Sequence, residues 1–470
     1  MGQSARQFNK ISIAKFQKNL INIDIKFIWQ YTVTYSQQQR SVIEMRNAIS
    51  LFSSSGIGDL GLRANGIVTV TACEILENRM KLFHNNYPQA KCFQGDIWKL
   101  KDEIISDYHA RFKDPPFMVL ATPPCQGMSS NGMGKMLSDY RKGLRPKMDE
   151  RNRLIIPTLE IIKSLQPEWV ILENVVNMTN TIIYDENNEL VNIIDYIKEK
   201  LGDLYFGRPS VIDAADYGVP QHRKRLITVL SKNEAVKEIY ESRGTLLPNY
   251  THSMTDTFFT HHWVTLREAI GDLPALRAEK GKNQSEGYNG LHKVPLLDEK
   301  KLFWVDNTKE GDTAFNNQCI SPQCGYQGNK THGASHNEDG IKKIHMDTPL
   351  YCEKCGSLLP RPYVEDSKTG EKRLMKGFVS AYKRMRWDEP ASTLTQNFQY
   401  ACSDNKLHPE QSRVLSLYEG LILHSIADYD YSFYIDGKIC SDSLIRDTIG
   451  ESVPPHVIDL ICSHILNIAI

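Results

Sequence analysis

Short apolar segments alternate with amphipathic ones over the first half of the chain, beginning at Asn47. Apolar runs with the length and composition of buried strands occur at 48–52, 67–74, 117–122, 168–175 and 225–230. Stretches with helical periodicity lie between them, such as RLIIPTLEIIKSL at 153–165. Strands that alternate with helices predict a doubly wound α/β fold, in which a parallel sheet carries helices on both faces.

The pattern changes after Ser231. Residues 232–382 are rich in Gly, Asn, His, Lys and aromatic residues, with weak periodicity, which indicates a smaller, loop-rich domain. Regular patterning returns at Lys383, and near the C-terminus Pro454 and Pro455 precede apolar positions at helical spacing. We therefore expect an N-terminal extension of unassigned role at 1–45, a main domain formed by 46–231 plus 383–470, and an inserted domain at 232–382.

Composition restricts the class of protein. The chain has 470 residues, 41% hydrophobic and 24% charged, which is typical of a globular protein. Lys plus Arg and Asp plus Glu number 56 each, so a nucleic-acid contact must come from a local basic patch. No apolar run approaches the ~18 residues of a membrane span, and no secretory signal pattern is present. The scattered cysteines suit a reducing compartment, so we expect a soluble, cytoplasmic protein without membrane contact.

Three glycines follow the first predicted strand, in FSSSGIGDLG at 52–61. Such a turn lets a ligand approach the backbone and the next helix N-terminus, but a tight turn without a ligand has the same pattern. Glu74 ends the next strand, where doubly wound folds place an acid that binds ribose hydroxyls, and Asp96 follows at the next strand end, suitably placed to meet an adenine. Alternatively, both acids cap helices. The turn lacks a phosphate-binding lysine motif, which disfavours ATP.

Cys125 follows an apolar strand and two prolines, in FMVLATPPCQGMS at 117–129. The prolines restrict the backbone, and the thiol emerges at the carboxyl edge of the sheet, where such folds bind ligands. A lone cysteine is otherwise often a small buried hydrophobe.

Polar residues at neighbouring strand ends favour a functional role for Cys125. Glu173 ends the strand at 168–175, and Arg223 and Arg225 introduce the strand at 225–230. A thiol, a carboxyl group and paired guanidinium groups together predict an active site. The alternatives are a helix cap for Glu173 and salt bridges or phosphate contacts for the arginines.

The ordered set FSSSGIG, ACE, GDI, PPCQG, ENV, QHRKR and GESVPP resembles the DNA (cytosine-5)-methyltransferase family, of restriction-modification type, over 47–231 and from 383 onward. The resemblance implies a Rossmann-like, S-adenosylmethionine-dependent methyltransferase domain with an inserted target-recognition domain. It also implies that Cys125 attacks C6 of cytosine, that Glu173 contacts N3, that Arg225 binds Glu173, and that Arg223 lies near the base.

The resemblance also implies two sets of binding residues. Those for S-adenosylmethionine are Phe52, Ser55, Gly56, Ile57, Gly58, Glu74, Ile75, Asp96, Ile97, Pro124, Glu451 and Ser452. Those for the DNA substrate are Gln126, Gly127, Ser129, Asn174 and Gln221. Two segments depart from the family pattern: the glycine turn is longer than usual, and Glu451 replaces an asparagine. An acid beside the methionine carboxylate is unfavourable unless it points away.

The expected reaction is methyl transfer from S-adenosylmethionine to C5 of a cytosine flipped out of a specific double-stranded DNA sequence. We expect a monomer associated with the nucleoid, and a cognate restriction endonuclease without a stable complex. One alternative is the tRNA-methylating branch of the family, which the long middle domain disfavours. The other is a non-catalytic nucleic-acid-binding protein, which the intact Cys125, Glu173 and Arg225 disfavour.

Cys319, Cys324, Cys352 and Cys355 cluster within the expected recognition domain. Two pairs of thiols at this separation resemble a zinc ribbon with four thiolate ligands, although the first pair is spaced more widely than usual. The alternative is four unligated thiols. His332, His336 and His345 are substitutes if one cysteine is not a ligand.

Overall fold

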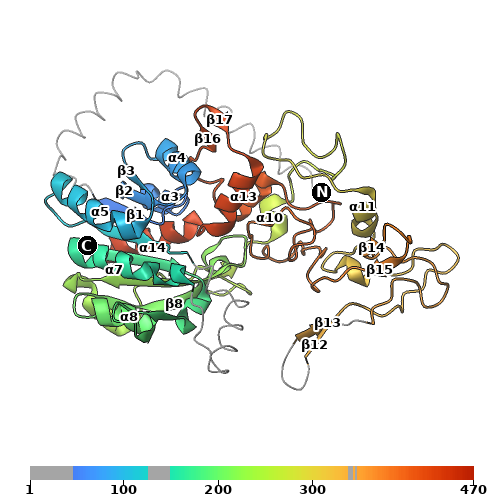
Figure 1. The fold of residues 1–470 in the computed structure, drawn as a ribbon, viewed down its shortest axis with the longest axis horizontal. Coiled ribbons are helices and arrows are strands. Elements are labelled where there is room, and N and C mark those ends of the chain that lie inside the picture. The colour runs from blue at the N-terminus through green and yellow to red at the C-terminus, as the bar shows by residue number, and fades with distance from the viewer. Residues whose placement is uncertain (1–45, 125–148, 337–341, 345–346, 470) are drawn as a thin grey trace, which may run out of the picture. The chain divides into compact units, whose positions relative to one another are not determined.

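The structure, a computed structural model, describes residues 46–124, 149–336, 342–344 and 347–469 (Figure 1). A seven-stranded sheet of order β3-β2-β1-β4-β5-β9-β8 forms its centre. The strands are β1 (Asn47–Leu51), β2 (Val68–Glu74), β3 (Lys91–Gln94), β4 (Met118–Ala121), β5 (Trp169–Asn174), β8 (Phe206–Asp213) and β9 (Lys224–Ser231). The helices that accompany it are α3 (Asp59–Ala64), α4 (Glu77–Asn86), α5 (Ile97–Arg111), α7 (Ile155–Leu165), α8 (Ile193–Leu201), α12 (Leu417–Leu423), α13 (Asp442–Glu451) and α14 (Pro455–Ile468).

Helices cover both faces of the sheet, as the sequence predicts. Consecutive strand residues point to opposite faces. Ile49 therefore joins a core cluster with apolar residues of α5, α7 and α8, whereas Ala48 joins another with residues of α3 and α14. Helix α14 begins at Pro455. Proline has no backbone N–H, and at the first position of a helix this group would have no partner within the helix, so no hydrogen bond is lost.

Strand β9 differs from the predicted parallel arrangement. It runs antiparallel to both of its neighbours, β5 and β8. Only residues 214–223 join β8 to β9, and they hold one short 3-10 turn, η4 (Ala214–Tyr217). A parallel connection needs a crossover of about a dozen residues or more, so this short link requires antiparallel strands.

The described residues within 232–382 form short elements. Their helices are α9 (Lys237–Arg243), α10 (Leu266–Ile270) and α11 (Glu299–Asp306), and their two-stranded sheets pair β10 (His252–Ser253) with β11 (His261–His262), β12 (Ala334–His336) with β13 (Lys342–Ile344), and β14 (Tyr363–Glu365) with β15 (Lys372–Leu374). Two further hairpins pair β6 (Ile182–Tyr184) with β7 (Leu190–Asn192) and β16 (Tyr434–Ile435) with β17 (Lys438–Ile439). Figure 1 shows long loops through the yellow and orange part of the chain, in agreement with the predicted loop-rich character.

A buried ion pair stabilises the returning C-terminal part of the chain, residues 383–470. Arg413 and Glu419 have exposed side-chain fractions of 1% and 0%, and both guanidinium NH₂ groups donate to the carboxylate at 2.7 Å. Burial alone would raise the pKa of Glu419, but the charge and hydrogen bonds of Arg413 outweigh it and lower the pKa to about 2. The carboxylate also caps α12, because it accepts the backbone N–H of Ser416.

Among the residues described, none of the helices combines the length and apolar content that a bilayer crossing needs.

Candidate active site

Most of the predicted site residues lie at one edge of the sheet, where β1, β2, β4 and β5 end and β9 begins. Carboxyl ends of parallel strands meet at a common edge, which is where open α/β sheets bind ligands. Cys125, Gln126, Gly127 and Ser129 lie outside the described residues. The described chain reaches Pro124, immediately before the predicted nucleophile, and resumes at Asp149.

The glycine turn after β1 has an unusual backbone. Phe52 and Ser54 adopt left-handed φ values of 56° and 47°, which non-glycine residues rarely do, and Gly56 has φ 83°. A Cβ atom on Gly56 would lie 2.4 Å from the ring of Tyr87, whose hydroxyl donates to the Gly56 carbonyl at 2.7 Å. Left-handed conformations of this kind cluster at ligand sites. The turn is therefore tightly specified and cannot accept a side chain at Gly56.

Two hydroxyl groups of this turn have no hydrogen-bond partner within the part of the chain that the structure describes. The Oγ atoms of Ser54 and Ser55 are buried and have no hydrogen-bond partner among the described residues. A buried polar group without a partner costs about 1–3 kcal/mol. The turn therefore fits a ligand that brings polar groups to these hydroxyls.

Glu74 links the turn to the next helix. Its carboxylate accepts the backbone N–H of Ser54 at 3.0 Å and that of Leu76 at 2.9 Å, and the side chain of Ile75 is 61% exposed beside it. Asp96 caps α5 by accepting the Trp98 N–H at 3.1 Å.

The remaining predicted cofactor residues of this region differ in exposure. Ile57 and Ile97 are buried in apolar core clusters, whereas Phe52, Gly58 and Pro124 are partly accessible.

Glu173 and Arg225 form a buried ion pair where β5 ends and β9 begins. Arg225 Nε lies 2.9 Å from Glu173 Oε1, and the exposed side-chain fractions are 14% and 8%. Burial raises the pKa of Glu173, and the positive charges of Arg225 and Arg223 oppose part of that rise. Desolvation thus favours the protonated carboxyl group while Arg225 fixes its position.

Asn174, predicted to bind substrate, connects β5 to the segment before Cys125. Its side-chain NH₂ donates to the Pro123 carbonyl at 3.0 Å, and its side-chain oxygen accepts the Val175 N–H at 2.8 Å. The amide thus holds the end of β5 against the two prolines.

Arg223 makes contacts that the sequence did not predict. Its guanidinium donates to the carbonyl groups of Leu394 at 2.8 Å, Gly450 at 2.9 Å and Ser452 at 2.7 Å, and the residue is 1% exposed. These groups are in the returning C-terminal part of the chain, so Arg223 joins that part to the start of β9. Its charge still acts on Glu173.

Gln221 has a similar position. Its NH₂ donates to the Leu423 carbonyl at 3.1 Å, and its oxygen accepts the Leu394 N–H at 2.8 Å. The residue is fully buried, which differs from the expected contact with DNA.

Two neighbouring side chains interact with the Glu451 carboxylate. It forms an ion pair with Arg79 of α4, and it accepts a hydrogen bond from the side-chain amide of Gln396. Arg79 could not be predicted as a partner, because Arg79 and Glu451 are distant along the chain. Ser452 Oγ lies 3.0 Å from Nε2 of the buried His424.

The four predicted metal ligands come together. The sulfur atoms of Cys319, Cys324, Cys352 and Cys355 all lie within 4.8 Å of one another. Sγ–Sγ distances are 3.7 Å for Cys319 and Cys355 and 3.9 Å for Cys324 and Cys352. Four thiolates at a Zn–S distance of about 2.3 Å have tetrahedral edges of about 3.8 Å, so this cluster fits zinc.

Of the three histidine substitutes, His332 has a described side chain, and it is not part of this cluster. The ring of His332 stacks on Phe315 at a centroid distance of 4.5 Å, and its ring nitrogens lie 3.3 Å from Thr348 Oγ1 and 3.2 Å from the Gly377 carbonyl oxygen. The His336 side chain and His345 lie outside the described part of the chain.

Comparisons with known proteins relate the chain to DNA methylases. A family model for C-5 cytosine-specific DNA methylases matches residues 46–467. Type II methyltransferase M1.HgaI of Avibacterium volantium is 29% identical over 435 residues, which are 89% of this chain and 98% of the relative. Type II methyltransferase M.AgeI of Thalassovita gelatinovora is 23% identical over 448 residues, which are 87% and 96% of the two chains.

A solved structure supports the fold. It is that of an E. coli prophage DNA modification methyltransferase, with a TM-score of 0.51 and 18% identity over 90% of this chain and 99% of that chain. The fold is that of S-adenosylmethionine-dependent methyltransferases. The chain belongs to the C-5 cytosine-specific DNA methylase family, as the resemblance implied, and is a DNA (cytosine-5)-methyltransferase.

Proposed function

We propose that the chain transfers a methyl group from S-adenosylmethionine to C5 of a cytosine in a specific double-stranded DNA sequence, with Cys125 as nucleophile and Glu173 at N3. The observation that carries the proposal is the buried Glu173–Arg225 ion pair at the end of β5, which Asn174 ties to the segment leading into Cys125. The setting is a restriction-modification system, in which the enzyme acts as a monomer without a stable complex with an endonuclease.

The chemistry of cytosine requires these groups. C5 is too poor a nucleophile to take a methyl group while the ring is aromatic. Addition of the Cys125 thiolate to C6, with a proton from Glu173 to N3, makes C5 an enamine carbon. S-adenosylmethionine, when bound, supplies the electrophilic methyl group. Loss of the C5 proton to a base, with return of the N3 proton, then expels the thiolate and restores the ring.

The remaining polar residues position this machinery. Arg225 orients the Glu173 carboxyl group, and Asn174 holds the Pro123 carbonyl. Arg223 and Gln221 fix the returning chain behind them, so we assign both as positioning residues and not as contacts to the base. The target cytosine must be flipped out of the duplex, which costs a few kcal/mol.

The glycine turn and the neighbouring strand ends form the proposed cofactor site. The unpartnered Ser54 and Ser55 hydroxyls fit the polar methionine end, and Glu74 accepts hydrogen bonds from ribose hydroxyls. The exposed side chain of Ile75 covers the adenine, and Asp96 meets its edge. Glu451 is tolerated near the methionine carboxylate because Arg79 balances its charge.

We assign residues 46–231 plus 383–470 to catalysis and residues 232–382 to recognition of the DNA sequence. Methyl transfer from labelled S-adenosylmethionine tests the activity, and bisulfite sequencing of DNA from cells that express the protein identifies the site. We expect label in duplex DNA and protected cytosines within one recurring sequence. Labelling of tRNA in place of DNA, or no protected cytosine, would contradict the proposal.

The cysteine cluster is proposed as a structural zinc site within the recognition domain, because its sulfur geometry fits a tetrahedral ion. We expect about one equivalent of zinc per chain by elemental analysis. Cys355→Ser should lose most of this zinc, whereas Cys402→Ser should retain it, because Cys402 is exposed and outside the cluster. A folded wild-type protein that contains no zinc would refute the assignment.

A further inference from the structure

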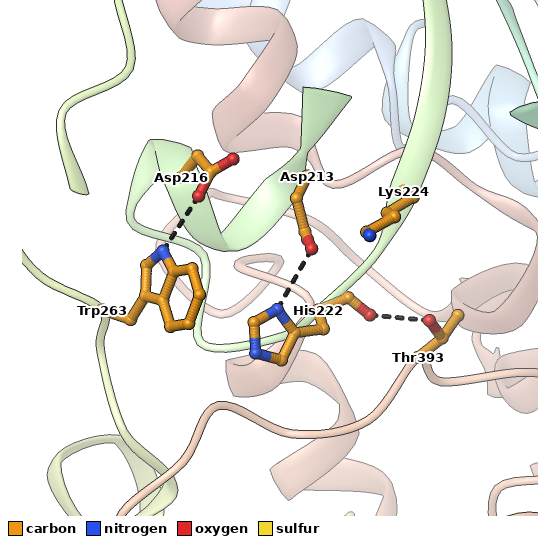
Figure 2. Close-up of a pocket in the computed structure, with 6 residues that line it drawn as sticks. All are labelled: Asp213, Asp216, His222, Lys224, Trp263 and Thr393. Carbon is orange, nitrogen blue, oxygen red and sulfur yellow. Dashed lines mark hydrogen bonds and ion pairs between the residues drawn. The ribbon is translucent and has the colours of Figure 1, made fainter. Parts of the chain in front are cut away.

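A cavity of about 570 Å³ lies where β8 ends and β9 begins. It is lined by Asp213, Asp216, His222, Lys224, Trp263 and Thr393 (Figure 2). Asp213 ends β8 and lies opposite Lys224, the first residue of β9, in the register of the two strands. The cavity therefore lies at the same edge of the sheet as the catalytic groups, one residue from Arg225.

Strand alternation relates the cavity to the ion pair. Lys224 and Arg225 are consecutive strand residues, so their side chains point to opposite faces of β9, although their Cα atoms are only ~3.8 Å apart. Arg225 faces Glu173, and Lys224 lines the cavity on the other face. The cavity and the ion pair therefore lie one residue apart along β9, on its two faces.

The two acids of the cavity are occupied by protein donors. Asp213 accepts His222 Nδ1 at 3.1 Å and the backbone N–H groups of Arg223 at 2.8 Å and Ala215 at 3.3 Å. Burial alone would raise the pKa of Asp213, but these hydrogen bonds hold it below its usual value.

Asp216 accepts the indole N–H of Trp263 at 2.9 Å, and the Trp263 and His222 rings are perpendicular, with a centroid distance of 4.8 Å. The acids thus hold the imidazole and the indole in place, as Figure 2 shows.

Lys224 is exposed, and its ammonium group makes no hydrogen bond or ion pair with any other described residue. The cavity therefore presents a cation without a hydrogen-bond or ion-pair partner among the described residues, a fixed imidazole and an aromatic wall. The charge of Lys224 also acts on the Asp216 carboxylate. This combination suits an anionic oxygen attached to a sugar, and lysine binds phosphate as a flexible point charge.

We propose that this cavity seats a phosphodiester group of the substrate strand next to the flipped cytosine. Lys224 pairs with its anionic oxygen, His222 is the second contact, and Trp263 packs against the adjoining sugar. The inference rests on the proposed function, and it assigns a positioning role, because backbone contacts fix register without reading sequence.

The salt dependence of DNA binding tests the Lys224 contact. Each neutralised phosphate contributes about 0.9 to the slope of log K against log salt concentration. Lys224→Gln should reduce this slope by about one and weaken binding to all duplex sequences by about tenfold at low salt. Lys163→Gln is the matched control, because Lys163 is exposed in the last turn of α7, immediately before β5 begins at the opposite edge of the sheet.

Neutral methylphosphonate linkages locate the contact. Once the target sequence is known, each phosphodiester near the target cytosine is replaced in turn. One of the two linkages flanking that cytosine should weaken wild-type binding by about tenfold, and the same linkage should have little effect on Lys224→Gln. Lys224→Arg should restore sensitivity to this linkage, because it restores the cation.

The outcomes separate this inference from the proposed function. If the wild-type protein transfers no methyl group to DNA, the proposed function fails. If it methylates DNA but Lys224→Gln keeps the wild-type salt slope and the wild-type sensitivity to methylphosphonates, the phosphate site is wrong.

Discussion

Replacing Glu173 with glutamine is expected to lower kcat for DNA methylation by about 10²- to 10⁴-fold. Glutamine has the same shape and can still donate a hydrogen bond to N3, but it has no proton to transfer. Without that proton, addition of the thiolate leaves negative charge on the ring nitrogen in a buried site. Single-turnover transfer of labelled methyl groups measures the effect independently of product release.

The pH profile of the same variant gives a second readout. Glu173 must carry its proton to act as an acid, so this contribution to the rate falls as the pH rises through its pKa. Burial raises that pKa, which moves the loss toward neutral pH. Glutamine does not ionise, so this limb of the profile should be absent from Glu173→Gln.

A matched control lies at the other end of the same strand. Glu168 precedes β5, and its carboxylate accepts hydrogen bonds from Trp169 and Asn233. Glu168→Gln can keep both bonds through its carbonyl oxygen and should retain wild-type kcat and pH dependence. A Glu173→Gln enzyme within tenfold of wild type, with an unchanged profile, would show that N3 is not protonated by this residue.

The strands that carry the site could be predicted because each is a buried apolar run. Strand β8 could not, since FGRPSVID is interrupted by Arg208, Pro209 and Ser210. It is an edge strand, where one side is unpaired and proline is tolerated. The antiparallel direction of β9 could not be predicted either, because an apolar run indicates that a strand is present but not which way it runs in the sheet.

The ion pair of the site was implied by the family motifs, and the structure places Glu173 against Arg225. The positions of Arg223 and Gln221 depend instead on partners 171 to 229 residues further along the chain. Such contacts appear only after folding, so local motifs could not separate the arginine that pairs with Glu173 from the one that binds backbone carbonyl groups. The Lys224 cavity was missed for the same reason: Trp263 and Thr393 reach it from distant segments.

The central claim is a covalent bond between the Cys125 sulfur and C6 of the target cytosine. Fluorine at C5 tests it, because C5 then carries no proton to be lost after methylation. The thiolate cannot be expelled, and the enzyme should remain attached to its substrate. Cys402→Ser, which removes an exposed thiol elsewhere, should be trapped as wild type is, whereas Cys125→Ser should not be trapped.

The decisive measurement is denaturing electrophoresis of the protein after incubation with S-adenosylmethionine and a 5-fluorocytosine duplex that contains its target sequence. We predict a stoichiometric protein–DNA adduct, with mass spectrometry locating the modified base on Cys125. If wild-type protein methylates the unmodified duplex yet forms no adduct with the fluorinated one, or forms it on another residue, the account is contradicted.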